Sequence, residues 1–496
     1  MGAIKSLAKD TVIYGISSII GRFLNWCLVP LYTYLFPQAE YGLMTYIYSF
    51  TALLLIILIY GMETGFFRFT NHERYKDVNE VYSTSLLSLG TTSLLFFILI
   101  LLFINPVSSS LHCADHRSFI IIMAAVLAID AFTSIPFCYL RLKHRPVRFA
   151  ALKLVSIALN IGFNLFFILL CPLLWEKFPQ TISWFYNPEY SIGYVFVSNL
   201  ISSGAVLLLL WPELKIFKWR FNFTLWKEMI VYSFPLLILG IAGIMNQTID
   251  KIMLPDLIAD KADAMAQEAI YGANYKIAIV MVMFIQAFRF AYEPFIFSQN
   301  KNAGASKNKA YSDAMKYFVI FSMVIFLGVM FYLNIVRRLI PPDYYSGLKI
   351  VPIVMIAEFF FGVFFNLSLW YKLTDKTIWG TWFSLLGLAV TLSLNFLLVP
   401  KIGYMGCAWA AFTCYGVMML ASYFVGKVKN PIPYPVGKIV GYVIAAIILY
   451  GISVFITTGN DFIDLPVRTV ILLAYIAAAV KIEHINLRDL IPMRHH

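Results

Sequence analysis

Fourteen apolar stretches, each close to the length of a membrane crossing, follow one another along this chain of 496 residues. A helix of about 20 apolar residues crosses the hydrocarbon core, where every backbone polar group must find a partner inside the protein. The stretches cover residues 11–36, 41–67, 80–105, 118–140, 149–172, 190–212, 228–254, 269–298, 313–335, 347–370, 378–399, 403–426, 437–457 and 465–480. The sequence therefore predicts an all-α polytopic membrane protein with 14 transmembrane helices.

Composition agrees with this class. The chain is 60% hydrophobic and only 13% charged, whereas a soluble domain is about 25% charged. The six cysteines contain no CxxC pair, and five of them lie in apolar stretches. We therefore expect them to pack in the core, without disulfides or a metal site.

The distribution of lysine and arginine predicts the orientation in the membrane. Of the 38 Lys and Arg residues, 26 flank the stretches on the side of the N-terminus and seven flank them on the opposite side. Because positive charge accumulates in cytoplasmic connections, both chain ends are predicted to be cytoplasmic. The lysines and arginines of the cytoplasmic connections account for the net charge of +12, so this charge does not indicate a nucleic-acid partner.

A weak internal repeat recurs at an offset of about 230 residues. Tyr41-Gly42 matches Tyr271-Gly272, Glu63 matches Glu293, and Tyr82-Ser83 matches Tyr311-Ser312. Repeats of this kind are typical of transporters whose substrate site lies between two repeats. The predicted domains are two parallel six-helix lobes, residues 1–220 and 221–430, followed by two further helices and a cytoplasmic tail, residues 431–496.

Several motifs resemble a known family. The segment Asp250-Lys251-Ile252-Met253-Leu254 and the segment that runs from Tyr271 to Ala278 are similar to two successive helices of that family. The pattern from Gly15 through Arg22 to Pro30, with the following Glu40-Tyr41-Gly42 turn, is similar to its N-terminal part. The chain resembles the polysaccharide flippase and exporter branch of the multidrug/oligosaccharidyl-lipid/polysaccharide (MOP) superfamily over most of its length.

This resemblance implies a MATE-like alternating-access fold in a bacterial cytoplasmic membrane. It also implies that the cargo is a polyprenyl-diphosphate-linked oligosaccharide, flipped for lipopolysaccharide O-antigen or other surface polysaccharide. Two alternatives within the superfamily stay open, a multidrug exporter coupled to H⁺ or Na⁺ and a lipid II flippase. An assembly enzyme would need a large outer loop, but the longest outer connection is only residues 173–189. No catalytic, metal or cofactor motif is present.

Basic residues inside the stretches are candidates for holding the substrate, because charge within a bilayer is costly and usually functional. Arg22 lies about 16 Å into the first helix at 1.5 Å per residue, and Asn25 shares its face. A diphosphate in a low-dielectric cavity needs such cations, although Arg22 could instead pair with a carboxylate between helices. Lys251 and Arg289 are further cavity candidates.

Five acidic residues are candidates for gating or ion coupling. Glu63 and Glu293 occupy equivalent repeat positions and suggest an inner gate, although Glu293 could simply pair with Arg289, and Glu63 more loosely with Arg68. Asp130 and Glu358 lie in equivalent helices, and Asp250 precedes Lys251. Because neighbours on a helix point about 100° apart, Asp250 and Lys251 are not expected to face one partner. Asp250 could also bond a neighbouring helix.

Overall fold

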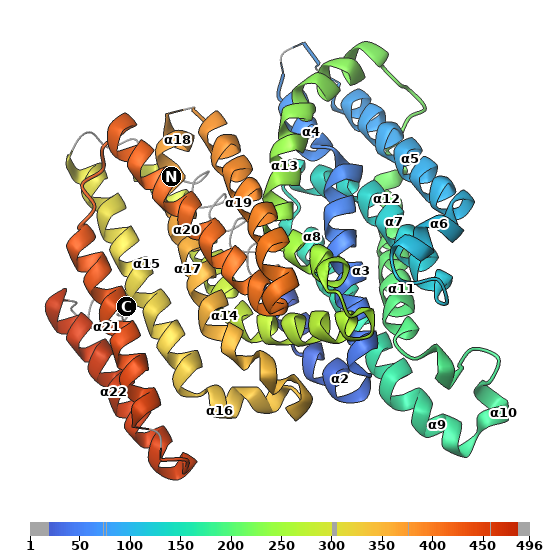
Figure 1. Cartoon of the computed structure of the whole chain (residues 1–496). Helices are drawn as coiled ribbons and strands as arrows, with labels where there is room; N and C mark the ends of the chain where they lie inside the picture. The colour runs from blue at the N-terminus through green and yellow to red at the C-terminus, as the bar shows by residue number, and fades with distance from the viewer. Residues whose placement is uncertain are drawn as a thin grey trace, which may run out of the picture. The chain divides into compact units, whose positions relative to one another are not determined.

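The computed structural model describes residues 19–72, 74–75, 77–299, 305–374, 376–456 and 458–484. Side chains are described in these ranges except at residues 262, 291, 293–299, 305–307 and 373. Within the described ranges, helices are the regular secondary structure and no strand forms (Figure 1). The predicted all-helical class is confirmed.

Twelve helices of the described chain are long and apolar enough to cross a membrane, and each overlaps one predicted stretch. They are Gln38–Thr70, Val78–Leu102, Arg117–Leu142, Pro146–Lys177, Phe223–Leu257, Asp263–Phe290, Asn308–Phe331, Pro342–Lys372, Ile378–Ile402, Tyr404–Lys429, Val436–Phe455 and Asp461–Ile482. The stretch 190–212 contains the shorter helix Gly193–Leu209. Part of the stretch 11–36 lies outside the described residues, so the total of 14 stays a prediction.

The chain divides into two compact units. Unit 1 comprises the chain up to Ala273 together with Ile378–Cys414, and unit 2 comprises Asn274–Thr377 together with the chain from Tyr415 onward. The predicted lobes, residues 1–220 and 221–430, with 431–496 appended, remain a prediction.

Unit 1 begins, within the described chain, with a helical segment at residues 19–26. It continues with α2 (Leu28–Leu35), α3 (Gln38–Ile59), α4 (Met62–Thr70), α5 (Val78–Leu102), α6 (Ile104–Ser110), α7 (Arg117–Leu142), α8 (Pro146–Leu165), α9 (Cys171–Lys177), α10 (Pro179–Ile182), α11 (Gly193–Leu209), α12 (Trp211–Leu214) and α13 (Phe223–Leu257). It also contains the start of α14 (Lys261–Gln299), α19 (Ile378–Ile402) and the start of α20 (Tyr404–Lys429). Short helical turns lie at Phe166–Leu170 (η1) and Pro188–Tyr190 (η2).

Unit 2 contains the remainders of α14 and α20. Its other helices are α15 (Ala305–Phe331), α16 (Leu333–Val336), α17 (Val351–Leu367), α18 (Leu369–Leu373), α21 (Val436–Phe455) and α22 (Asp461–Ile482). Short 3₁₀ turns, Arg337–Leu339 (η3) and Pro342–Ile350 (η4), precede α17. Helix α15 packs against α17, α21 and α22.

The second predicted crossing is broken into α3 and α4. Tyr60 and Gly61 both have left-handed backbones, with φ of 36° and 72°. A left-handed residue ends a helix, and glycine adopts this conformation without a steric penalty. Residues of two other helices hold the break in place. Ser233 Oγ of α13 donates to the Gly61 carbonyl at 3.3 Å, and the Tyr60 hydroxyl lies 2.7 Å from Ser88 Oγ of α5.

A proline explains the irregular turn in the fifth predicted crossing. Pro172 has no backbone N–H to donate, and its ring would clash with the carbonyl four residues earlier in a regular α-helix. The chain forms a π-helical turn at Phe166–Leu170 just before it. In a π-helical turn the hydrogen bonds run from residue i to residue i+5, so the backbone stays helical up to the proline.

Helices α3 and α14 approach each other closely within unit 1, and the repeated Tyr-Gly pairs lie at this contact. An ideal Cβ on Gly42 would lie 1.9 Å from the Met265 carbonyl oxygen, and one on Gly272 would lie 2.9 Å from Thr45 Cγ2. Tyr41 and Tyr271 are buried beside them. The two glycines therefore allow the backbones of α3 and α14 to approach closely, as small residues do between membrane helices.

In unit 2, a buried carboxylate connects three helices. Glu483, which directly follows α22, accepts from Lys316 Nζ of α15 at 2.6 Å and from Lys438 Nζ of α21 at 3.2 Å. The Tyr442 hydroxyl also donates to it, at 2.9 Å. Burial acts to raise the pKa of Glu483, but the three hydrogen bonds outweigh that effect and hold its pKa below the ordinary value.

We expect Glu483→Gln to lower the thermal stability of the purified protein at neutral pH and to have little effect in acid. A carboxyl whose folded pKa is depressed stabilises the fold above its unfolded pKa of about 4.3, and this contribution is lost as pH falls through the folded pKa. The test compares the melting temperatures of both proteins from neutral pH down to about pH 3. Glu189→Gln, an exposed position, is the control. A difference that stays constant with pH would contradict the expectation.

Candidate functional site

Asp250, Lys251 and Tyr271 form one cluster in unit 1. The Tyr271 hydroxyl donates to Asp250 Oδ2 at 2.5 Å. Lys251 Nζ lies 3.4 Å from Asp250 Oδ1 and 5.4 Å from the centroid of the Tyr271 ring. The expectation that Asp250 and Lys251 cannot face one partner is wrong. The long lysine side chain folds over the tyrosine ring, so that the direction of its Cβ does not fix where its charge lies.

Glu268 lies beside this cluster and was missed at the sequence level. It is fully buried, and neither of its carboxyl oxygens has a hydrogen-bond partner among the described residues. It interacts electrostatically with Lys251 and Asp250. The sequence around it is acidic and suggests a loop, but α14 already begins at Lys261. The spacing to Tyr271, three residues on, would have placed both on one helix face.

Arg22 and Asn25 lie on the helical segment 19–26, and both side chains are exposed. Across the described chain, Arg22 forms no ion pair with a carboxylate. An ideal Cβ on the neighbouring Gly21 would lie 2.6 Å from Ile157 Cδ1 of α8. The segment thus packs closely against α8 next to the residue that carries the charge.

Glu63 and Asp130 share a basic neighbour. Lys153 of α8 interacts electrostatically with both carboxylates, and Arg141 of α7 interacts with Glu63. Ser203 of α11 hydrogen-bonds Asp130. Lys153 was not singled out from the sequence, yet it interacts with both candidate acids. Lys153 lies inside the predicted stretch 149–172, and a charge within an apolar stretch is the sequence signal that could have identified it.

The looser pairing expected between Glu63 and Arg68 does not appear in the described part of the chain. The Arg68 guanidinium lies 4.0 Å from the centroid of the Tyr232 ring of α13. Glu63 lies near the start of α4 and Arg68 in its last turn. Five residues along a helix turn the two side chains about 140° apart, which explains why each has a different neighbour.

Two cations of unit 2 approach the same aromatic ring. The Arg289 guanidinium lies 3.8 Å from the centroid of Phe365, and Lys372 Nζ lies 4.4 Å from it. The residues come from α14, α17 and α18, and no sequence pattern connects them. The side chain of Glu293, the expected partner of Arg289, lies outside the described residues.

Glu358 of α17 is buried in unit 2, and the Tyr275 hydroxyl of α14 donates to its Oε1. Glu358 thus resembles Asp250 in unit 1, since both carboxylates accept from a tyrosine of α14. Proton or cation coupling at either residue remains a proposal.

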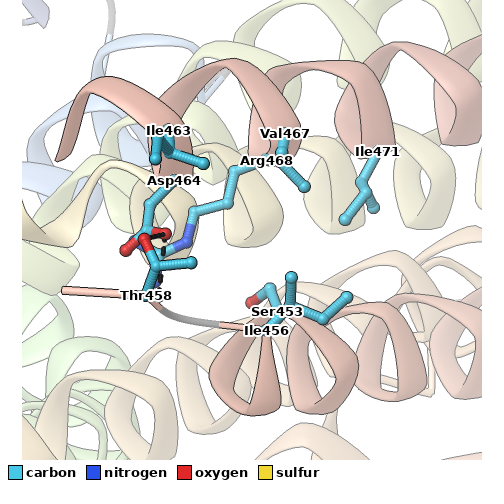
Figure 2. Close-up of a pocket in the computed structure, with 8 residues that line it drawn as sticks. All are labelled: Ser453, Ile456, Thr458, Ile463, Asp464, Val467, Arg468 and Ile471. Carbon is cyan, nitrogen blue, oxygen red and sulfur yellow. Dashed lines mark hydrogen bonds between the residues drawn. The ribbon is translucent and has the colours of Figure 1, made fainter. Parts of the chain in front are cut away.

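A separate pocket lies in unit 2 between α21 and α22. It is lined by Ser453, Ile456, Thr458, Ile463, Asp464, Val467, Arg468 and Ile471 (Figure 2). Asp464 Oδ1 accepts from the backbone nitrogen and hydroxyl of Thr458, at 2.9 and 2.8 Å. Arg468 donates to the Phe331 carbonyl at 3.2 Å. The Asp464 bonds close the turn between α21 and α22, and the Arg468 bond connects α22 to the end of α15. The pocket includes none of the predicted site residues.

The fold matches solved structures of transporters at low sequence identity. The lipid II flippase MurJ in an inward closed conformation is 14% identical, with a TM-score of 0.73 over 95% of this chain and 99% of that chain. A multidrug resistance MATE transporter of the MOP superfamily in an inward-facing conformation is 14% identical, with a TM-score of 0.63 over 84% and 97%. A MOP superfamily transporter from Pyrococcus furiosus is 13% identical, with a TM-score of 0.61 over 86% and 98%. These likenesses define the class as a multi-pass membrane protein with the MOP transporter fold.

The family follows from the sequence. A family model described as "Polysaccharide biosynthesis protein" matches residues 7–299, which is more than half of the chain. The chain belongs to this family, and the predicted resemblance to the polysaccharide branch of the MOP superfamily is confirmed. A comparison with curated protein sequences finds no match.

Proposed function

We propose that this protein is a flippase for a polyprenyl-diphosphate-linked oligosaccharide, serving surface polysaccharide such as O-antigen in a bacterial inner membrane. The family match and the MOP fold support a flippase. The observation that carries the choice of substrate is the pair of cations, Arg289 and Lys372, that approach the Phe365 ring within unit 2. Two adjacent positive charges are what a diphosphate requires.

An aromatic ring is a suitable support for such a site. It attracts a guanidinium or ammonium group through its quadrupole and helps to fix its position. Arginine can then bind a phosphate through two parallel hydrogen bonds, and lysine adds a point charge. Arg22, Asn25 and Lys251 complete the proposed substrate-binding set.

Transport in this proposal is alternating access without any chemical step, so the protein is not an enzyme. The headgroup binds from the cytoplasmic side, the glycan occupies a hydrated lumen, and the lipid tail stays in the bilayer. The lobes predicted from the repeat then rock to open outward. Glu63 and Glu293 are proposed as an inner gate, and Asp130, Asp250 and Glu358 as gate or ion-coupling residues, with both chain ends cytoplasmic.

The test measures lipid-linked oligosaccharide in cells that lack the protein and in cells that carry Arg22→Ala. We expect the precursor to accumulate on the cytoplasmic leaflet in both. Loss of a charge-assisted hydrogen bond costs about 1.5–3 kcal/mol, so the alanine variant should bind the headgroup about tenfold more weakly or worse. Arg22→Lys, which keeps the charge, should retain partial function, and all variants are checked for membrane insertion.

Other outcomes separate the rival functions. If deletion leaves every lipid-linked saccharide unchanged but sensitises cells to organic cations, the protein is a cation-coupled multidrug exporter. If only the peptidoglycan precursor accumulates, it is a lipid II flippase. If Arg22→Ala exports normally while deletion blocks export, Arg22 lies outside the substrate path and the substrate assignment stands on Arg289 and Lys372.

A further inference from the structure

Glu268 has the smallest exposed fraction of the acidic residues whose side chains the structure describes. Its exposed fraction is 0%, and both carboxyl oxygens are without a hydrogen bond from any described residue. An ionised carboxylate in such surroundings is very costly, and a buried carboxyl that lacks donors carries a proton instead. Burial without a hydrogen-bond donor therefore favours the neutral, protonated form of Glu268.

Titratable groups on three other helices interact with Glu268. On α13 they are Asp250 and Lys251, on α3 Tyr46, and on α20 Cys407, which all interact with it electrostatically. Asp250 is already occupied by the hydroxyl of Tyr271 on α14 and by Lys251. Lys251 interacts electrostatically with Glu268, so its ammonium can balance the carboxylate charge if Glu268 loses its proton.

Tyr46 gives Glu268 a connection toward solvent. The Tyr46 hydroxyl is buried, has no hydrogen-bond partner in the described chain, and interacts electrostatically with both Glu268 and Asp256. The Tyr46 hydroxyl and the Glu268 carboxyl each lack a hydrogen-bond partner in the described chain, and a hydrogen bond between them would satisfy both. The Tyr46 ring centroid is 5.9 Å from that of His112.

The path ends at a surface ion pair. His112 Nε2 lies 2.8 Å from Asp256 Oδ1, and the two side chains are 36% and 52% exposed. Both residues lie in unit 1, as do Tyr46 and Glu268. His112 follows the third predicted stretch and Asp256 follows the seventh, at the face that the lysine and arginine distribution assigns to the outside. Titratable groups therefore lead stepwise from that surface to the enclosed acid.

We propose that Glu268 binds and releases one proton in each transport cycle and exchanges it with the outer solution through Tyr46 and the His112–Asp256 pair. On release the Glu268 O–H bond breaks and the proton passes to the Tyr46 hydroxyl. Tyr46 gives its own proton to Asp256 or His112, which passes it to water. The remaining Glu268 carboxylate is countered by the Lys251 ammonium. Proton binding stands on this geometry, whereas its link to transport rests on the proposed function.

Infrared difference spectroscopy on the purified full-length protein in lipid nanodiscs tests proton binding directly. We expect a carbonyl stretch of a protonated acid that disappears in Glu268→Gln and persists in Glu176→Gln, an exposed carboxyl on α9. Tyr46→Phe should keep this band but slow its hydrogen–deuterium exchange at least about tenfold, since each 1.4 kcal/mol of barrier is a factor of ten. A band unchanged in Glu268→Gln would refute the site, and unchanged exchange in Tyr46→Phe would refute the path.

Flipping assays test the link to transport. In proteoliposomes that contain a fluorescent polyprenyl-diphosphate disaccharide, the wild-type rate should depend on an imposed pH gradient. Glu268→Gln, which imitates the protonated acid, should flip at a rate independent of the gradient, and Glu176→Gln should behave as wild type. Gradient dependence that survives in Glu268→Gln would overturn the coupling. A wild-type protein that flips no probe contradicts the proposed function alone, because the infrared band still decides the proton site.

Discussion

Replacing Gly42 by alanine is expected to prevent most of the chain from accumulating as a folded membrane protein. The added Cβ would lie 1.9 Å from the Met265 carbonyl oxygen and 3.2 Å from the Ala269 backbone nitrogen. Both atoms belong to the backbone of α14, so no side-chain rotation relieves the clash and the two helices must separate. Overpacking costs about 1–3 kcal/mol when side chains can adjust, and here they cannot.

Two other glycines provide graded controls. Gly272→Ala meets Thr45 Cγ2 at 2.9 Å, and because a threonine side chain can shift, we expect a smaller loss. Gly162→Ala, within α8, meets nothing within 4 Å and should be neutral or stabilising by up to about 1 kcal/mol. Detergent-extracted yield and melting temperature measure the series. If Gly42→Ala and Gly162→Ala have the same yield and the same melting temperature, the close approach of α3 and α14 is contradicted.

The combined substitution of Arg289 and Lys372 by alanine is expected to reduce flipping of a polyprenyl-diphosphate probe by about a hundredfold or more. A hydrogen bond to a charged group contributes about 1.5–3 kcal/mol, so each single alanine variant should lose about tenfold or more. The measurement is the initial flipping rate in proteoliposomes at probe concentrations below saturation. Binding of the soluble diphosphate headgroup should weaken in parallel.

Two variants separate charge from structure in this experiment. Phe365→Leu keeps both cations but removes the ring that orients them, and we expect an intermediate loss. Lys427→Ala removes an exposed lysine of α20 and should flip the probe as wild type does. If the double variant is folded and flips at the wild-type rate, the diphosphate site lies elsewhere, and Arg22 and Lys251 become the next positions to test.

Hydropathy and charge were sufficient to predict the helical fold. Each of the twelve candidate crossings overlaps a predicted stretch, because the bilayer sets both the length and the composition of a crossing. The break at Tyr60 and Gly61 was not predicted. A tyrosine followed by one glycine carries no strong stop signal, and the left-handed backbone there is held by Ser233 and Ser88 from distant parts of the chain.

The site was predicted less well, for a physical reason. A charge in an apolar stretch is visible in a sequence, so Arg22, Asp250, Arg289 and Glu358 could be singled out. What each contacts depends on tertiary packing, and neither the shared Phe365 ring nor the Lys153 contact with two acids has a local signal. Glu268 was overlooked because it lies in the connection between the predicted stretches 228–254 and 269–298. Acidic residues in such a connection normally contact water.

The interruption between α3 and α4 has an electrostatic consequence for Glu63. In a continuous helix this residue would lie far from either terminus, but the break makes it an acidic residue of the first turn of α4. The first N–H groups of a helix lack intrahelical acceptors, and the aligned peptide dipoles give that end about half a positive elementary charge. This partial charge stabilises an anion there by about 0.3–1 kcal/mol. The backbone of the second crossing therefore supports a negative charge inside the crossing itself, in addition to Arg141 and Lys153.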